Sequence, residues 1–257
     1  MAPIPSATVD QLAGYLLDGA RPDPVAHELA CWLTTSARFR SFAEVHRDKI
    51  RKKLRTAADG EALRDVRAEL QAAHLLLDDP RIELAFEAYG SGQSGPDLSL
   101  TYRGTRSCNL EVTRLHGVPS QIDVGLPLLT KLRQLPPSVP NAVLVAIAGG
   151  AAAALDVDGA TKALRSRADA RDATFFTRRG FDGTRGFYDR YLRLGGVVTW
   201  CEDAVGDARA GLWTNRSARI PLPERDIRAV LRCLRNAAST PSPGRRDSRA
   251  MMEGPIS

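Results

Sequence analysis

The chain has few residues that could build a disulfide framework or a structural zinc site. Only four of its 257 residues are cysteine and four are histidine. The cysteines are scattered, without a CxxC pair, and no histidine lies at zinc-ligand spacing. This pattern excludes the common zinc motifs and is typical of reduced thiols in a cytoplasmic protein.

Long hydrophobic runs and a recognisable targeting segment are also missing. The longest apolar stretch, residues 141–155 (NAVLVAIAGGAAAAL), is too short and too rich in Gly and Ala to span a bilayer. The first ten residues, MAPIPSATVD, lack a basic segment followed by an apolar run. We therefore expect no association with a membrane.

No G-x-S-x-G motif accompanies the histidines, which disfavours a serine hydrolase.

What the chain does have is a moderate excess of basic residues. Lys and Arg exceed Asp and Glu by 36 to 30, which gives a net charge of +6. This excess is compatible with a polyanionic partner such as nucleic acid. The densest basic run is RDKIRKKLR, residues 47–55. The run is either a solvated helix face or a contact to a phosphate backbone, and the sequence leaves both interpretations open.

The first part of the chain is predicted to be helical. Apolar residues recur at three- and four-residue spacing through residues 6–17, and again from Asp23 or Pro24 onward. The spacing therefore predicts an N-terminal extension, residues 1–57, made of two helices. Residues 59–79 carry an apolar stripe and predict a further helix.

The spacing of apolar residues then changes to the alternation that is typical of strands. Three alternating segments follow, separated by short turns, at residues 81–90, 96–104 and 108–115. They predict an antiparallel meander of three strands. A helix over residues 121–135 and the wholly apolar strand NAVLVAIA, residues 141–148, come next; such a strand is expected to be covered on both faces.

The remaining sequence predicts more helices and one more pair of strands. The Arg-rich segment of residues 151–190 is expected to be helical. Residues 195–204 and 210–223 are expected to form the strand pair, and residues 224–236 a closing helix. The tail, residues 238–257, lacks apolar periodicity and is expected to be disordered. This order of elements predicts an α/β fold.

Residues 90–95, GSGQSG, match the G-x-G-x-x-G pattern of a dinucleotide-binding loop, but in the wrong context. Such a loop must open a helix whose N-terminus holds the pyrophosphate. Here Pro96 and an alternating segment open a strand instead. We interpret these residues as a flexible hairpin loop.

Three acidic residues indicate a candidate site. Glu111 lies in a strand between Leu110 and Val112, and burial of a lone carboxylate is costly unless a cation or a hydrogen-bond donor compensates it. A short turn between antiparallel strands can place Asp97 beside Glu111, and Glu69 lies on the preceding helix. Clustered carboxylates repel one another, so without metal at least one of them should have a raised pKa.

Each acid also has a purely structural explanation. Glu69 is compatible with the surface of a helix, and Asp97 follows a proline as turn residues often do. A salt bridge to an arginine would account for Glu111. The residues alone leave the structural and the functional interpretations open.

The order of elements over residues 59–147 resembles that of the PD-(D/E)xK nuclease superfamily. The matching features are a helix with Glu, a strand, a strand that opens with PD, a strand with E-x-x, a helix with KLRQL and an apolar strand. The resemblance implies a restriction endonuclease-like fold, which has a mixed central sheet flanked by helices. It also implies that residues 58–237 form one nuclease-like domain.

The resemblance further implies a metal site. Asp97 and Glu111 would bind Mg²⁺ or Mn²⁺, and Glu69 would supply a further direct or water-mediated ligand. The backbone carbonyl of Val112 would coordinate the same ion.

One position departs from the family pattern, because Thr113 stands where the motif lysine is expected. That lysine orients or activates the attacking water, and a threonine has no positive charge to supply. Lys131 on the next helix, with Gln134 one turn on, is the first candidate to replace it, although both also fit a solvated helix face. Arg103, which strand alternation places on the same face as Asp97, is the second candidate. Arg114 is disfavoured because strand alternation turns it to the opposite side.

The resemblance implies a Mg²⁺-dependent endonuclease that hydrolyses phosphodiester bonds in DNA, with the basic N-terminal helices gripping the backbone. The alternative is a catalytically inactive nuclease-fold module that binds nucleic acid or a protein partner. A third interpretation is a non-nuclease enzyme on an unrelated α/β fold. Members of the superfamily often dimerise, so a homodimer fits the resemblance. His116, just past the third strand, is the only histidine expected near the site.

Overall fold

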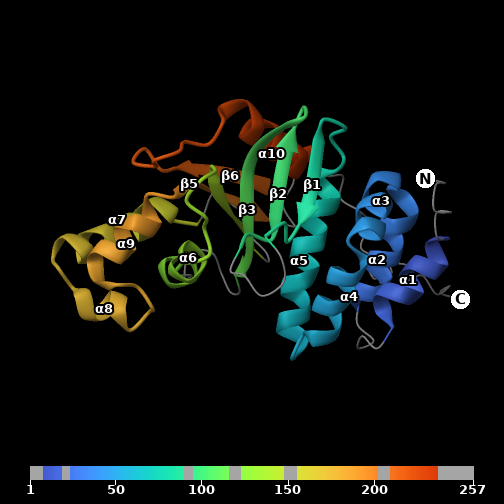
Figure 1. Cartoon of the computed structure of the whole chain (residues 1–257), viewed down its shortest axis with the longest axis horizontal. Helices are drawn as coiled ribbons and strands as arrows, with labels where there is room; N and C mark the ends of the chain where they lie inside the picture. The colour runs from blue at the N-terminus through green and yellow to red at the C-terminus, as the bar shows by residue number, and fades with distance from the viewer. Residues whose placement is uncertain are drawn as a thin grey trace, which may run out of the picture.

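The central element of the fold is a six-stranded mixed β-sheet with helices on both faces (Figure 1). This confirms the predicted α/β class and the mixed sheet flanked by helices. The computed structural model describes residues 8–18, 24–89, 95–115, 123–147, 155–201 and 209–236. Most of the GSGQSG segment, His116 and the tail of residues 238–257 lie outside the described residues.

The strands follow one another across the sheet in the order in which they occur in the chain. They are β1 (Ile82–Phe86), β2 (Leu98–Tyr102), β3 (Thr105–Leu115), β4 (Asn141–Ile147), β5 (Leu194–Cys201) and β6 (Ala210–Thr214). The first three form the predicted antiparallel meander. β3, β4 and β5 run parallel to one another, and β6 returns antiparallel to β5.

The N-terminal region contains more helices than the sequence predicts. The segment expected as a single second helix is divided into α2 (Pro24–Thr35), α3 (Ala37–Val45) and α4 (Arg47–Thr56), after α1 (Val9–Leu17). The first break occurs at Ser36, whose backbone is extended and whose side chain accepts a hydrogen bond from the amide of Phe39 at 3.1 Å. A serine that caps the next helix competes with continuation of the previous one, which periodicity alone does not reveal.

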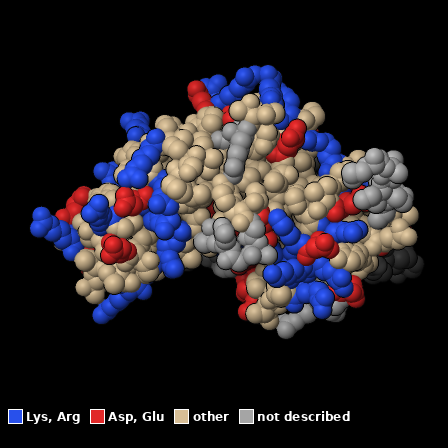
Figure 2. Space-filling model, viewed as in Figure 1, with Lys and Arg blue, Asp and Glu red and all other residues tan. Residues whose placement is uncertain are grey.

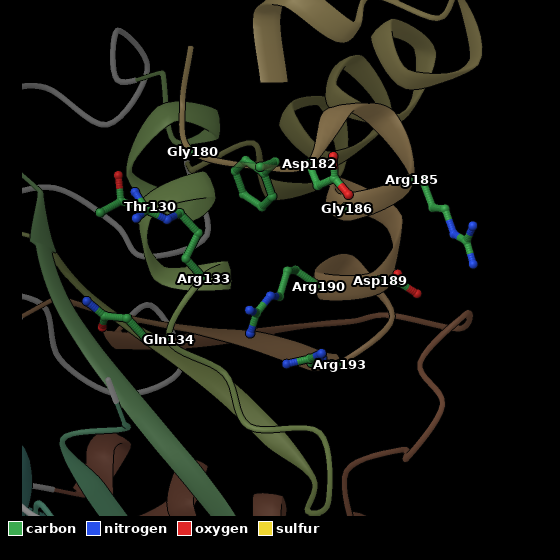
Figure 3. Close-up of a pocket in the computed structure, with 11 residues that line it drawn as sticks. Thr130, Arg133, Gln134, Gly180, Asp182, Arg185, Gly186, Asp189, Arg190 and Arg193 are labelled. Atoms are coloured by element: carbon green, nitrogen blue, oxygen red, sulfur yellow. The ribbon is translucent and has the colours of Figure 1, made fainter. Parts of the chain in front are cut away.

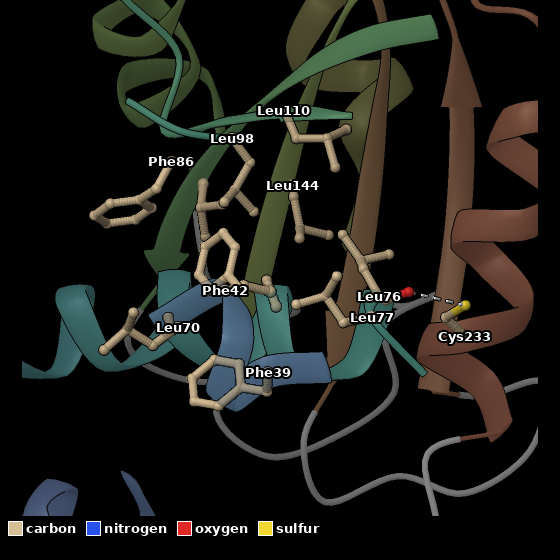
Figure 4. Close-up of a cluster of buried hydrophobic side chains, with 14 of the residues drawn as sticks. Phe39, Phe42, Leu70, Leu76, Leu77, Phe86, Leu98, Leu110, Leu144 and Cys233 are labelled. Atoms are coloured by element: carbon tan, nitrogen blue, oxygen red, sulfur yellow. Dashed lines mark hydrogen bonds between the residues drawn. The ribbon is translucent and has the colours of Figure 1, made fainter. Parts of the chain in front are cut away.

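One face of the sheet packs against α5 (Gly60–Leu76), α10 (Glu224–Asn236) and the N-terminal helices. The Asp59 side chain caps α5 by accepting a hydrogen bond from the amide of Ala62 at 2.8 Å. Figure 4 shows this core, in which apolar side chains of the sheet meet those of α3 and α5. Its labelled members include Leu98, Leu110, Leu144, Leu70, Leu76, Phe39 and Phe42.

The other face of the sheet is covered by α6 (Gly125–Leu132), α7 (Val157–Asp169), α8 (Ala173–Thr177) and α9 (Gly183–Tyr191). In β4 every residue is buried: Val143 and Val145 belong to this core, while Ala142 and Leu144 belong to the opposite one. The strand is therefore covered on both faces, as its wholly apolar sequence predicts.

A buried polar network fixes the pairing of the central strands. The Ser99 hydroxyl donates to the Asn109 side-chain oxygen at 2.9 Å, and the Asn109 amide donates to Asn141 at 3.1 Å. Asn141 in turn donates to three backbone carbonyls. Because polar groups in a core are costly when they lack partners, the network disfavours any other register of β2, β3 and β4.

The described cysteines are all free thiols, as their spacing predicts. Among the described residues, the structure contains no helix that is both long enough and apolar enough to cross a membrane.

Candidate active site

The register of β2 and β3 brings Asp97 and Glu111 together. Leu98 pairs with Leu110 at the end of the paired segment. Asp97, which precedes Leu98, therefore lies next to Glu111, which follows Leu110. There the Asp97 carboxylate accepts a hydrogen bond from the amide of Val112 at 2.9 Å. Both acids are buried, with 8% of Asp97 and 1% of Glu111 exposed. The burial of Glu111 agrees with the apolar strand around it.

Glu69 joins this pair from α5, on the other side of the ladder's end. The ammonium group of Lys53, on α4, lies 2.5 Å from the Glu69 carboxylate and 3.1 Å from that of Asp97. It also lies 3.3 Å from the carboxylate of Glu87, just after β1. Lys53 therefore connects three acids that come from different parts of the chain.

Lys131 reaches the same place from α6. Its ammonium group lies 2.6 Å from the Glu111 carboxylate and 3.9 Å from that of Asp97. The side-chain amide of Gln134 lies against Glu111 as well, and with its nitrogen turned toward the carboxylate it donates to both oxygens. We call the group formed by Glu69, Asp97, Glu111, Lys53 and Lys131 the acid–lysine centre.

The other cations that the sequence offered lie elsewhere. Arg103 is in the turn between β2 and β3, and its guanidinium lies over the ring of Tyr102, 5.6 Å from the centroid. The expectation that Arg103 shares a face with Asp97 is wrong, because a register shift after Leu100 and a positive φ at Arg103 turn it away. Arg114 pairs with acids on α5, in line with its orientation in the strand.

Lys53 is the residue that the sequence interpretation missed. The basic run of residues 47–55 was expected to be either a solvated helix face or a contact to a phosphate backbone. Instead, the side chains of Lys49 and Lys53 contact other parts of the protein. Lys49 donates to two backbone carbonyls at the end of β1, at 3.0 and 2.9 Å, while Lys52 is exposed. The available signal is the four-residue spacing of Lys49 and Lys53 beside Ile50 and Leu54, which are buried.

The electrostatics of the centre reflect clustered buried carboxylates. Burial, followed by the charge of Asp97, raises the pKa of Glu111 to about 7 against the opposing effect of Lys131. Burial and Asp97 likewise raise the pKa of Glu69 well above its ordinary value. Burial alone would also raise the pKa of Asp97, but Lys131 and Lys53 together hold it below its ordinary value. The sequence predicts a raised pKa for at least one of these carboxylates, and the pKa is raised for two of them, Glu69 and Glu111.

Both lysines remain charged in this environment. Burial disfavours an ammonium ion, but the charges of Glu69 and Asp97 raise the pKa of Lys53 above its ordinary value. Asp97 and Glu111 do the same for Lys131. The centre therefore contains two fixed positive charges within hydrogen-bonding distance of buried acids.

The oxygen atoms at the centre are of the kind that hard divalent cations take as ligands. Asp97 and Glu111 offer carboxylates, and the carbonyl of Val112 shares a side of β3 with the amide that binds Asp97. Mg²⁺ takes few protein ligands because it keeps several waters, and Mn²⁺ favours the same donors. Within the described ranges, no group of three or more His, Cys, Asp or Glu side chains could by itself hold a metal ion.

Chemically, the centre presents carboxylate oxygens and can donate protons or hydrogen bonds from two ammonium groups and one amide. This combination suits an anionic substrate whose negative charge grows during reaction. Comparison with protein-family models, curated proteins and solved structures gives no match to this chain.

Proposed function

We propose that this protein is a Mg²⁺- or Mn²⁺-dependent nuclease that hydrolyses phosphodiester bonds in DNA, on a restriction endonuclease-like fold. The observation that carries the proposal is the position of Lys131. Its ammonium group lies 2.6 Å from Glu111 and 3.9 Å from Asp97, where it can supply the positive charge that Thr113 lacks.

The order of elements supports the finer assignment of the fold. α5 with Glu69, the meander β1–β3 with Asp97 and Glu111, α6 with Lys131, and the parallel strand β4 follow one another along the chain. This is the succession on which the resemblance to the PD-(D/E)xK superfamily rests.

In the proposed reaction, a cation held by Asp97, Glu111 and the carbonyl of Val112 would neutralise charge on the scissile phosphate and lower the pKa of the attacking water. Lys131 would orient that water or donate to a phosphate oxygen as negative charge develops there. Gln134 would hold the Glu111 carboxylate in place through its amide.

The acids at the other side of the centre have a supporting role. Glu69, which is 8% exposed, completes the carboxylate group as a direct or water-mediated ligand. Lys53 would balance its charge and fix its orientation, because its ammonium group contacts both Glu69 and Asp97. Restraint of ligand side chains in this way strengthens metal binding.

The distribution of basic side chains favours a polyanionic substrate. Figure 2 shows Lys and Arg over several regions of one face, among them one around α6–α9 and another around α4 and α5. The centre draws its lysines from α4 and α6, which belong to these two regions. A nucleic-acid backbone across the centre would therefore meet positive charge on both sides.

The test is cleavage of plasmid and of single-stranded DNA in the presence of Mg²⁺ or Mn²⁺. We expect the variants Asp97→Asn and Glu111→Gln to lose at least about 10²-fold in rate, because each removes a ligand from the ion. The matched control is Glu83→Gln, which changes an exposed acid on β1 and should cleave like the unmodified chain. Calorimetric titration with Mg²⁺ should give binding heat for the unmodified protein and much less for Glu111→Gln.

Absence of cleavage in the unmodified protein, or equal cleavage in all four proteins, would refute the nuclease. DNA binding without cleavage would assign the chain to the catalytically inactive module instead. Loss of the Mg²⁺ response in Glu111→Gln without any cleavage by the unmodified protein would leave a metal site with a different role, and would also refute the proposal.

A further inference from the structure

A pocket of about 810 Å³ lies between α6 and α9, and its wall is rich in arginine. Arg133 comes from the end of α6, and Arg185, Arg190 and Arg193 come from α9 and the residues after it. Figure 3 shows the side chains of Arg190 and Arg193 close together, while Arg133 comes from α6 with its guanidinium beside Gly180. We call this site the arginine pocket.

Within the part of the chain that the structure describes, the arginines of this pocket lack the acidic partners that the lysines of the centre have. The side chains of Arg133, Arg185 and Arg190 make no hydrogen bond or ion pair with any part of the chain that the structure describes. Two acids also line the pocket, and one of them, Asp189, is paired with Arg219 at 3.0 Å. The pocket therefore carries a net positive charge that the described residues do not balance.

Burial, followed by the charge of Arg190, holds the pKa of Arg193 below its ordinary value. Like charges that are close together and partly shielded from water repel one another, and an anion between them would remove the repulsion. The pocket thus favours a ligand with concentrated negative charge.

Two of the arginines are held in place by the surrounding backbone. Arg193 donates to the carbonyl of Leu135 at 3.1 Å. Arg133 packs on Gly180, where an added Cβ would lie 2.9 Å from its guanidinium carbon and where φ is +78°. A side chain at position 180 would therefore displace Arg133, so the glycine is needed for this wall of the pocket.

The pocket shares the end of α6 with the acid–lysine centre. Thr130, Arg133 and Gln134 line the pocket, while Lys131 points to Glu111 in the centre. Gln134 touches both sites, because its amide also lies against Glu111. A single extended anionic chain can therefore occupy the pocket and the centre together.

We infer that the arginine pocket binds a backbone phosphate of the DNA strand whose neighbouring phosphodiester lies at the acid–lysine centre. The choice of DNA rests on the proposed function, whereas the affinity for phosphate rests on the arginines alone. Arginine suits this role because its planar guanidinium binds two phosphate oxygens at once.

The test is the binding of a fluorescent single-stranded oligonucleotide, measured by anisotropy in EDTA over a range of salt concentrations. The variant pair Arg133→Ala/Arg190→Ala should weaken binding at least about 10-fold and lower the slope of log K against log salt by about 0.7, the value for one lost phosphate contact on a single strand. The charge-preserving pair Arg133→Lys/Arg190→Lys should retain most of the affinity, which separates loss of charge from loss of packing. The control pair Arg225→Ala/Arg228→Ala removes the same charge from the exposed side of α10 and should bind within about two-fold of the unmodified protein.

Equal weakening by the pocket pair and the control pair would overturn the inference, as would no weakening by the pocket pair. Titration with inorganic phosphate distinguishes a site for small anions. Stabilisation of the protein by phosphate, lost in the pocket pair without any change in DNA affinity, would also overturn it.

The two proposals fail separately. Glu111→Gln should keep the affinity and the salt slope for DNA while it loses cleavage. A protein that never cleaves, but whose pocket pair binds DNA more weakly than the control pair, would retain the inference and refute the nuclease. A protein that cleaves, but whose pocket pair binds DNA with normal affinity, would refute the inference and retain the nuclease.

Discussion

The acid–lysine centre and the arginine pocket lie at the same helix, yet they use positive charge in opposite ways. In the centre, Lys53 and Lys131 each touch buried acids of the chain itself. In the pocket, Arg133 and Arg190 contact no acid among the described residues. Removal of one partner from a buried ion pair destabilises a protein, whereas unpaired and accessible charges attract a ligand of opposite charge. The difference predicts separate effects for substitutions at the two sites.

The largest effect should come from Lys53. Lys53→Met leaves Glu69 and Asp97 buried without their shared cation, so we expect the free energy of unfolding to fall by about 3 kcal/mol at pH 8. Urea denaturation measures this change. Lys52→Met is the matched control, because that neighbour is exposed and should change stability by less than about 0.5 kcal/mol. Equal stability of the two variants would contradict the structural role of Lys53.

Lys131 should matter for the reaction and, because it also neutralises the buried Glu111, for stability. If the protein is a nuclease, Lys131→Met should lower the cleavage rate about 10²- to 10³-fold, as loss of a charge that stabilises the transition state does. The measurement is initial cleavage rate beside DNA affinity, since affinity should change much less. Lys162→Met, which removes a lysine with 72% of its side chain exposed on α7, should cleave normally. A parallel fall in affinity and rate would place Lys131 in binding instead.

The stability of the centre should also depend on pH. The pKa of Glu111 is about 7 in the folded protein and near its ordinary 4.5 in the unfolded chain, so between these values the folded state binds more protons. Glu111 should therefore contribute a fall in stability as the pH rises from 5 to 8, on the order of 3 kcal/mol. The lowered pKa values of His46 and His74 oppose this fall below their ordinary 6.5. The raised pKa of Glu69 acts in the same direction as that of Glu111. Asp97 acts in the opposite sense, but only below its ordinary 3.8 and hence outside this range.

Urea denaturation in EDTA at several pH values measures the effect. Glu111→Gln should reduce the dependence between pH 5 and 8, because the substituted side chain does not titrate, and should leave the part that Glu69 contributes. Unchanged pH dependence in Glu111→Gln would show that Glu111 is not the group responsible.

The smallest effects on stability should come from the pocket. Arg133→Ala/Arg190→Ala removes no described ion pair, so we expect the free energy of unfolding to stay within about 0.5 kcal/mol of the unmodified protein. Thermal or urea denaturation measures this. A stability loss as large as that of Lys53→Met would mean that the pocket arginines serve folding, and the contrast between the two sites would disappear.

Much of the architecture follows from local patterns. The alternating segments around Leu84, Leu100 and Val112 predict the meander, and the apolar run of β4 predicts a strand buried on both faces. The helix breaks at Ser36 and His46 were missed, because the apolar periodicity continues across them. At Ser36 a side-chain cap starts the next helix, whereas His46 makes no side-chain capping bond. Capping competes with periodicity at single residues, so boundaries are less predictable than elements.

The candidate site likewise has one part that the sequence predicts and one part that it does not. The proximity of Asp97 and Glu111 follows from strand pairing, since two strands joined by a short turn have a defined register. The convergence of Lys53 and Lys131 does not follow from any local pattern. They lie on helices packed at different sides of the sheet, and only packing brings their ammonium groups to the same carboxylates.

The sequence by itself therefore determined the kinds of element, their order and the burial of a carboxylate in the third strand, because these depend on residues close together in the chain. Only the tertiary structure decided which cations neutralise that carboxylate and which arginines remain unpaired. Distances between side chains from separate helices are set by how the helices pack on the sheet, and that packing depends on the whole core.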